Sequence, residues 1–239
     1  MLAFFPIYGI HPIHLVVMVV GLVLSLWASS RVKGAFAKWS QVRSRSGVTG
    51  AQVAHAILQA NGIRDVRVEP VAGNLTDHYD PRTKTLRLSE PVYHSDSVAA
   101  VGIAAHEVGH AIQHAHRYAP LTFRSAWVPV AGLGTNLGML LLMIGLPIAY
   151  YGSPLLAWIG VALYATAAVF TLITLPVEFD ASRRALATIE ASGVLIADER
   201  AGAKKVLDAA ALTYVAAAAV AMLELMAFVV QLLDAQRRE

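Results

Sequence analysis

Four long stretches with no charged residue, or with only one, constrain the fold of this sequence more than any other feature. They cover residues 13–29, 129–151, 155–177 and 209–233. At about 1.5 Å of rise per residue, a helix as long as the second stretch covers about 35 Å, enough to cross a hydrocarbon core of about 30 Å. Charged residues make up only 15% of the chain, against about 25% in soluble domains. The sequence therefore predicts a mainly α-helical membrane protein with about four transmembrane helices.

Basic residues set the expected orientation in the membrane. Residues 31–46, directly after the first apolar stretch, contain five basic side chains and no acidic one. Because this charge follows the apolar run, we interpret the run as an uncleaved transmembrane helix and not as a signal peptide. The positive-inside rule then places the segments 31–126 and 178–208 in the cytoplasm. The lipid bilayer is an expected partner, whereas a net charge of +3 is too small and too scattered to indicate nucleic acid.

This topology divides the chain into five expected regions. They are an N-terminal transmembrane helix (1–30), a cytoplasmic domain (31–126), a transmembrane hairpin (127–177), a cytoplasmic helical segment (178–208) and a C-terminal transmembrane helix with its tail (209–239). The last apolar stretch contains Glu224. A carboxylate inside a span indicates either a functional site or a hydrogen-bonded contact between helices, and the sequence leaves both interpretations open.

One motif in the cytoplasmic domain carries chemistry. His106, Glu107 and His110 form H-E-x-x-H, in a proline-free stretch that Ser95, Asp96 or Ser97 can cap. On a helix, residues four apart share a face, so the two imidazoles can bind one Zn²⁺ while Glu107 lies beside the metal as a base. The chain has no cysteine, so any zinc must be held by histidine and carboxylate. The expected cofactor is Zn²⁺.

The rest of the cytoplasmic domain reads as a small α+β, zincin-like fold. A helix is expected at residues 49–61, with Thr49 as its N-cap and Gly62 ending it. Alternating apolar residues within 63–89, broken by a turn at 80–84, predict a short antiparallel sheet of two or three strands. Such a sheet edge can bind an extended peptide or can be purely structural, and both interpretations remain open.

A catalytic zinc needs a third protein ligand, and two residues compete for the role. His116 has the spacing of the metzincin pattern, but the glycine of that pattern is replaced by Gln113, which continues the helix and carries His116 off the ligand face. His114 lies on the ligand face one turn too far along and is expected to flank the site. Glu178 follows the third apolar stretch on the same side of the membrane, and Pro176 just before it predicts a helix start there.

The sequence resembles the YugP-like family of bacterial membrane zinc metallopeptidases along nearly its whole length, and more distantly the HtpX-like proteases. The resemblance rests on three motifs: Asp77-His78-Tyr79-Asp80-Pro81 with Leu86-Arg87-Leu88-Ser89, Ala104 to Gln113, and Glu178-Phe179-Asp180-Ala181-Ser182. It implies Glu178 as the third metal ligand, beside His106 and His110. The related proteases carry an aspartate where Ser182 stands, so the hydrogen-bond partner of a zinc histidine is expected to be Ser182, Asp180 or another residue.

The expected function is that of a zinc-dependent endopeptidase in the inner (plasma) membrane of a bacterium, multi-pass and with its active site facing the cytoplasm. Glu107 acts as general base toward a water activated by zinc. The resemblance implies protein or peptide substrates, with membrane-protein quality control as a physiological role. His78, Tyr79 or Tyr93 is a candidate for polarising the substrate carbonyl. The alternative is a non-enzymatic zinc-binding scaffold or a divalent-metal carrier that uses Glu224, and the sequence carries no signal for an oligomeric state.

Overall fold

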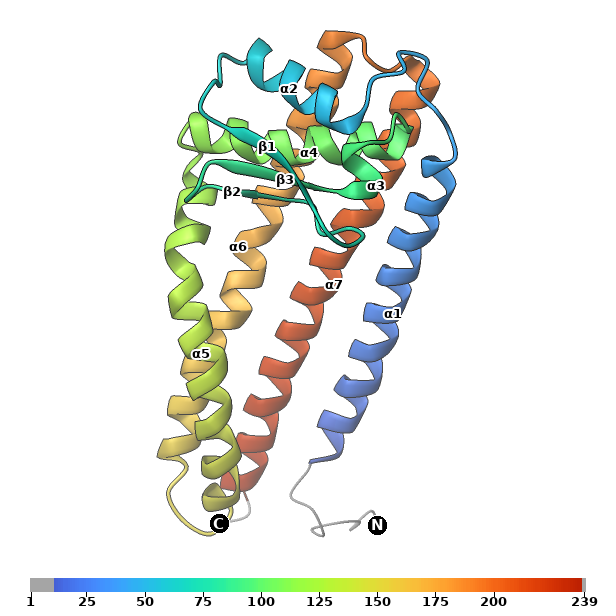
Figure 1. Cartoon of the computed structure of the whole chain (residues 1–239). Coiled ribbons are helices and arrows are strands. Elements are labelled where there is room, and N and C mark those ends of the chain that lie inside the picture. The colour runs from blue at the N-terminus through green and yellow to red at the C-terminus, as the bar shows by residue number, and fades with distance from the viewer. Residues whose placement is uncertain (1–10, 238–239) are drawn as a thin grey trace. The chain divides into compact units, whose positions relative to one another are not determined.

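The computed structural model describes residues 11–237, most of which are helical (Figure 1). The elements in chain order are α1 (Pro12–Ser40), α2 (Gly50–Ala60), β1 (Arg67–Val71), β2 (His78–Asp80), β3 (Thr85–Ser89), α3 (Glu90–Tyr93), α4 (Val98–Ala115), α5 (Ala119–Ala149), α6 (Leu155–Ser192) and α7 (Ala197–Gln236). They form two compact units, which are described separately. The apolar unit comprises the described parts of Met1–Trp27, Phe123–Thr174 and Tyr214–Glu239, and the mixed unit comprises Ala28–Thr122 and Leu175–Thr213.

Within residues 11–237, four helices are long and apolar enough to cross a membrane, namely α1, α5, α6 and α7. This number agrees with the prediction, but the helix start expected at Pro176 is wrong because α6 runs through that proline. A proline inside a helix costs about 3 kcal/mol. Val177, Ala181 and Ala185 follow it fully buried, and their burial stabilises the helix beyond the proline. Glu178 therefore lies in the middle of a long helix and not in a first turn.

In the apolar unit, α5 and α6 approach each other closely at glycines. A Cβ atom on Gly138 would lie 2.7 Å from the backbone nitrogen of Tyr164, and one on Gly145 would lie 2.5 Å from that of Ala157. Small residues of this kind let helix backbones pack tightly where no hydrophobic effect drives them together. The Tyr164 hydroxyl donates a hydrogen bond to the Glu224 carboxylate on α7, so Glu224 makes a contact between two helices.

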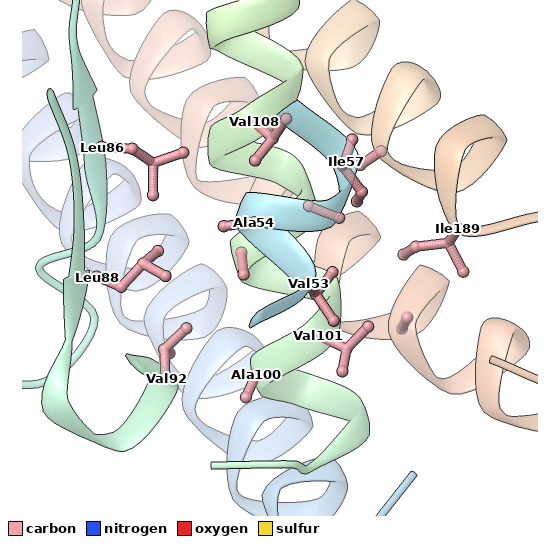
Figure 2. Close-up of a cluster of buried hydrophobic side chains, with 14 of the residues drawn as sticks. Val53, Ala54, Ile57, Leu86, Leu88, Val92, Ala100, Val101, Val108 and Ile189 are labelled. Carbon is pink, nitrogen blue, oxygen red and sulfur yellow. The ribbon is translucent and has the colours of Figure 1, made fainter. Parts of the chain in front are cut away.

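The mixed unit has its own hydrophobic core, built around α4 (Figure 2). Thr49 caps α2 in a capping box with Gln52, as predicted for the N-cap, and Gly62 follows the helix with a φ of 71°. Ser97 caps α4. The core joins α2, β3, α3, α4 and the parts of α6 and α7 that belong to this unit. Its labelled members are Val53, Ala54, Ile57, Leu86, Leu88, Val92, Ala100, Val101, Val108 and Ile189. Because α4 packs on both the sheet side and the α6 side, its position is fixed from two directions.

The sheet has three strands in the order β1-β3-β2. The hairpin predicted around residues 80–84 is present, since β2 and β3 pair antiparallel. The prediction of a wholly antiparallel sheet is wrong, because β1 pairs parallel with β3. The physical reason is that β3 is the most buried strand, with Leu86 and Leu88 fully buried, and the central position also pairs its backbone on both edges, with β1 on one side and β2 on the other. β2 is therefore an edge strand, and it contacts α4.

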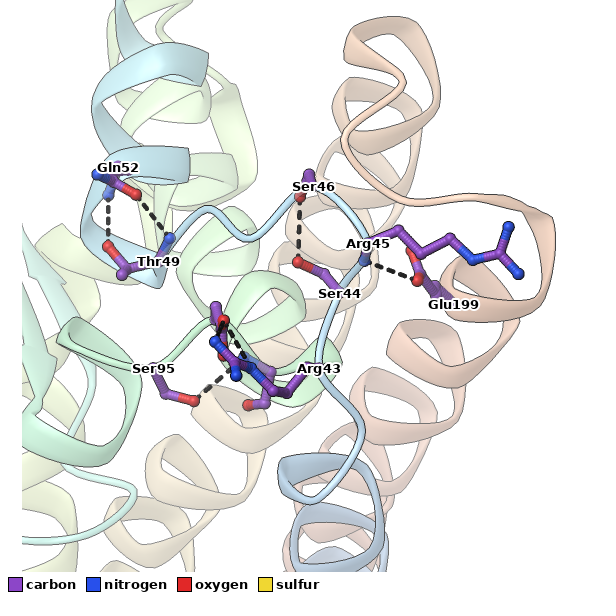
Figure 3. Close-up of polar contacts among 10 residues, drawn as sticks. Arg43, Ser44, Arg45, Ser46, Thr49, Gln52, Ser95 and Glu199 are labelled. Carbon is purple, nitrogen blue, oxygen red and sulfur yellow. Dashed lines mark hydrogen bonds and ion pairs between the residues drawn. The ribbon is translucent and has the colours of Figure 1, made fainter.

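The segment after α1 anchors the beginning of α4 (Figure 3). The backbone N–H of Val98 donates to the carbonyl of Val42 (2.8 Å), and the Arg43 guanidinium binds the Asp96 carboxylate with distances of 2.6 and 2.9 Å. The backbone N–H of Arg45 donates to the Glu199 carboxylate at 2.9 Å (Figure 3). This segment fixes where the helix that carries the H-E-x-x-H motif starts.

Candidate metal centre

His106 and His110 lie one turn apart on α4 and face Glu178 of α6. Their Nε2 atoms are 3.3 and 3.5 Å from Oε2 of Glu178. The two imidazole rings have centroids 4.8 Å apart and are nearly perpendicular. The carboxylate is almost fully buried, with 2% of the residue exposed. The structure thus brings together, from two helices, the three residues that the sequence analysis expected to hold the metal.

Gly109, between the two histidines, lets α4 and α6 meet at this point. A Cβ atom there would lie 2.5 Å from the carbonyl oxygen of Ala181, which is closer than van der Waals contact permits. Because Ala181 lies between Glu178 and Ser182, any larger residue at position 109 would push both side chains away from the histidines. The glycine inside the motif is therefore a packing requirement of the site.

Each histidine uses Nδ1 for a hydrogen bond and so directs Nε2 toward Glu178. Nδ1 of His106 is 3.0 Å from Oγ of Ser182, and Nδ1 of His110 is 3.0 Å from Oε1 of Gln113. Ser182 was one of the expected partners. Asp180 reaches neither ring directly and instead accepts a hydrogen bond from Gln113 (2.9 Å). Such outer hydrogen bonds fix the orientation of metal-binding histidines.

The sequence analysis missed the role of Gln113 because it considered this residue only as the replacement for a glycine. The available signal was its spacing: three residues after His110, it lies on the same side of the helix. Its side chain is fully buried, and a buried amide must be hydrogen-bonded to be tolerated. Both properties indicate a partner within the site.

Glu107 lies beside the cluster and is buried, with 8% of the residue exposed. Burial raises the pKa of Glu107 above its ordinary value, although the neighbouring His106 and His110 act in the opposite direction. A carboxylate with a raised pKa is a better proton acceptor near neutral pH than an ordinary surface glutamate. The position and environment suit a general base.

The remaining expected residues are not part of the cluster. His116 is exposed and caps the end of α4. His114 contacts Tyr79 of β2, with 2.8 Å between Nδ1 and the hydroxyl oxygen. Burial raises the pKa of Tyr79 to about 12, so this hydroxyl keeps its proton at neutral pH. The exposed ring of His78 contacts the Thr76 carbonyl, and Tyr93 packs against the neighbouring His94.

The donor set and its spacing fit a zinc ion. Ligand atoms about 2.0–2.1 Å from a tetrahedral zinc are about 3.3 Å from one another, close to the 3.3 and 3.5 Å that separate Glu178 from the two histidines. Two imidazole nitrogens and one carboxylate also leave a fourth position for water or substrate, as catalytic zinc sites require. Within residues 11–237 this is the one group of three histidine or acidic residues close enough to hold a metal ion.

Comparisons with known proteins agree with this geometry. The model of a family described as "Putative neutral zinc metallopeptidase" matches residues 14–233. The chain is also 48% identical over 216 residues to the "Putative membrane protease YugP" of Bacillus subtilis (strain 168). These aligned residues cover 90% of this chain and 95% of that protein. No solved structure matches the chain. The chain therefore belongs to this family of neutral zinc metallopeptidases, whose cofactor is Zn²⁺.

Proposed function

We propose that this protein is an integral-membrane, zinc-dependent endopeptidase whose catalytic centre is His106, Glu107, His110 and Glu178. The observation that carries the proposal is the convergence of two histidine Nε2 atoms on one carboxylate oxygen across α4 and α6: each nitrogen lies within 3.5 Å of Oε2 of Glu178, and a buried glutamate lies beside them. His106, His110 and Glu178 hold the metal. When bound, zinc supplies a Lewis acid that polarises the scissile carbonyl and lowers the pKa of a water molecule to about 7.

Glu107 carries the proton transfers. Its carboxylate accepts a proton from the attacking water and delivers that proton to the leaving nitrogen, so that one side chain serves as base and then as acid. The buried environment that raises the pKa of Glu107 supports both steps. Glu107 is not needed to bind the metal, since three other side chains provide the ligand atoms.

The edge strand β2 is the proposed binding site for the peptide. Among the residues that the structure describes, no strand pairs with its outer side in the sheet order β1-β3-β2, and it lies next to α4, so an extended substrate can pair with it by strand addition. The Tyr79 hydroxyl, on the same strand and hydrogen-bonded to His114 of α4, is the group proposed to contact the substrate carbonyl. The substrates proposed are unfolded or damaged segments of membrane proteins, as in quality control.

The proposed location is the inner membrane of a bacterium, with the zincin-like mixed unit in the cytoplasm. Its support is the segment after the first span, where residues 31–46 contain five basic side chains and no acidic one. The rival functions are a zinc scaffold and a metal carrier. A carrier places its ligands inside spans, whereas the candidate ligands here lie in the mixed unit and Glu224 is hydrogen-bonded to Tyr164, which favours the enzyme.

The decisive experiment is Glu107→Gln in the purified, zinc-loaded protein. Amide and carboxylate have nearly the same shape, but the amide cannot accept the proton, so we expect zinc content and fold to be retained while cleavage of a casein-like substrate falls by at least about 100-fold. Glu90→Gln, which changes an exposed glutamate of the same unit, is the matched control and should cleave normally. Cleavage by the Glu107 variant at the wild-type rate would exclude the mechanism, and a wild-type protein that binds zinc without cleaving would favour the scaffold.

A further inference from the structure

Gln113 is a polar residue in a place where an apolar one would pack more simply. Its side chain is fully buried and makes three hydrogen bonds. The Nε2 atom donates to the carbonyl of Val177 (2.8 Å) and to Oδ2 of Asp180 (2.9 Å), while Oε1 lies 3.0 Å from Nδ1 of His110. Gln113 thus connects His110, a candidate metal ligand on α4, to Val177 and Asp180, which precede and follow Glu178 on α6.

The orientation of the Gln113 amide follows from its neighbours. A backbone carbonyl and a carboxylate are both acceptors, so the group that faces Val177 and Asp180 must be the NH₂ group. The Val177 carbonyl can only accept and so fixes this orientation by itself, while Asp180 is held in place by the guanidinium groups of Arg183 and Arg184, the latter at 2.5 Å. The amide oxygen of Gln113 therefore faces His110 and can only accept a hydrogen bond.

The consequence for His110 is that Nδ1 must be the donor of this bond and Nε2 is left for the metal. His106 differs, because the Ser182 hydroxyl beside it can either donate or accept and does not select one form of the ring. We propose that Gln113 is a positioning residue that orients His110 for metal binding and whose own orientation is set by Val177 and Asp180. The proposal deepens the proposed function, because it concerns a ligand of the same centre.

A purely structural role for Gln113, as a tether between α4 and α6, makes a different prediction. The tether depends on the amide donors that reach Val177 and Asp180, whereas positioning of His110 depends on the acceptor oxygen. Gln113→Leu removes both, whereas Gln113→Glu keeps an acceptor oxygen for His110 but places its second oxygen against the Val177 carbonyl and the Asp180 carboxylate, so it harms the tether more than leucine does. If positioning is the role, the glutamate variant binds zinc more tightly than the leucine variant; if tethering is the role, it binds zinc no better than the leucine variant.

The test measures zinc affinity by competition with a chelator for the wild type, Gln113→Leu and Gln113→Glu, with folding checked by circular dichroism. We expect leucine to weaken zinc binding about 10- to 100-fold, the usual effect of losing an outer partner of a metal-binding histidine, and glutamate to recover at least about 10-fold of that loss. Wild-type affinity in the leucine variant, or equal loss in both variants, would overturn the proposal.

A second measurement needs no variant at this position. In the zinc-loaded wild type, ¹⁵N-histidine spectra should show a His110 Nδ1–H proton that exchanges slowly with water, because it is buried and hydrogen-bonded. Rapid exchange of that proton would also overturn the proposal. Neither readout depends on peptide cleavage, so a failure of the proposed peptidase activity and a failure of this inference are distinguishable.

Discussion

The contact between α4 and α6 in the mixed unit and the contact between α5 and α6 in the apolar unit are both built on glycine, yet they differ in what accompanies the glycine. Gly109 brings α4 against Ala181, and the hydrogen bonds of Gln113 to Val177 and Asp180 and of His106 to Ser182 then fix the register of the two helices. Between α5 and α6, the close approaches at Gly138 and Gly145 are accompanied by hydrogen bonds from the side chains of Trp127 and Thr166 to backbone carbonyls. These bonds join the two helices but orient no ionisable group, whereas those between α4 and α6 hold a carboxylate opposite two imidazoles.

This difference implies that small shifts have unequal consequences in the two places. Packing contacts between apolar helices tolerate adjustments of a few tenths of an ångström at modest cost. A displacement of about 1 Å at a catalytic centre can cost about 100-fold in rate. Variants that disturb each contact by a similar amount therefore test whether the hydrogen-bonded register has functional importance.

Removal of the ligand that α6 contributes should have the largest effect. We expect Glu178→Ala to weaken zinc binding by more than the roughly 10- to 100-fold expected for an outer residue, because it deletes a ligand and leaves the two histidines alone. His116→Ala is the matched control, since His116 is exposed at the end of α4, and should bind zinc as the wild type does. Equilibrium metal content after dialysis measures both; the reverse pattern would favour a metzincin-like centre.

A smaller effect is expected from adding one methyl group where the two ligand helices meet. In Gly109→Ala the new Cβ would lie 2.5 Å from the Ala181 carbonyl oxygen, so α6 must move, and we expect kcat/KM to fall about 100-fold. In Gly102→Ala on the same helix the new Cβ would lie 3.1 Å from the Ala203 methyl group and 3.4 Å from its Cα, a milder contact away from the ligands, and kcat/KM should change by no more than a few-fold. Both substitutions favour the helix by about 1 kcal/mol, so the difference in kcat/KM between the two variants reports the contact between α4 and α6 at Gly109. Equal activities in the two variants would show that the register is not important.

The smallest effect on activity is expected in the apolar unit. Gly138→Ala places a Cβ 2.7 Å from the Tyr164 backbone nitrogen and should lower the free energy of unfolding by about 1–3 kcal/mol, while the folded variant still cleaves peptide. Gly132, with no atom within 4 Å of its virtual Cβ, provides the control. Detergent titration followed by circular dichroism measures the stability. A loss of cleavage in folded Gly138→Ala protein would mean that the two contacts are not functionally distinct.

The sequence predicted best what depends on short spacing along one helix. His106, Glu107 and His110 lie within five consecutive positions of α4, so the helical period alone places them, and the cap of α2 at Thr49 is similarly local. The topology made Glu178 one of two candidates for the third ligand and the family resemblance then implied its role, because no local pattern links it to a helix far away in the chain. Its position in the middle of α6 was predicted wrongly, since the burial that carries the helix through Pro176 comes from α4.

The sheet shows the same limit. The hairpin of β2 and β3 follows from a turn between two adjacent strands, and it was predicted. The parallel pairing of β1 with β3 depends on which strand takes the central position, and that is decided by the burial of Leu86 and Leu88 against α4. Likewise, the bonds of Gln113 to Val177 and Asp180 join residues distant in sequence, and no periodicity reports them.

The shortness of β2 has a consequence for the choice of substrate. This edge spans only His78–Asp80, so a peptide laid along it can form only a few main-chain bonds and can place few side chains in defined surroundings. Binding through so few contacts distinguishes unfolded from folded polypeptide much better than it distinguishes one amino-acid sequence from another. Because this strand is short, the proposed peptidase would select its substrates by their loss of native structure and not by a recognition motif in their sequence.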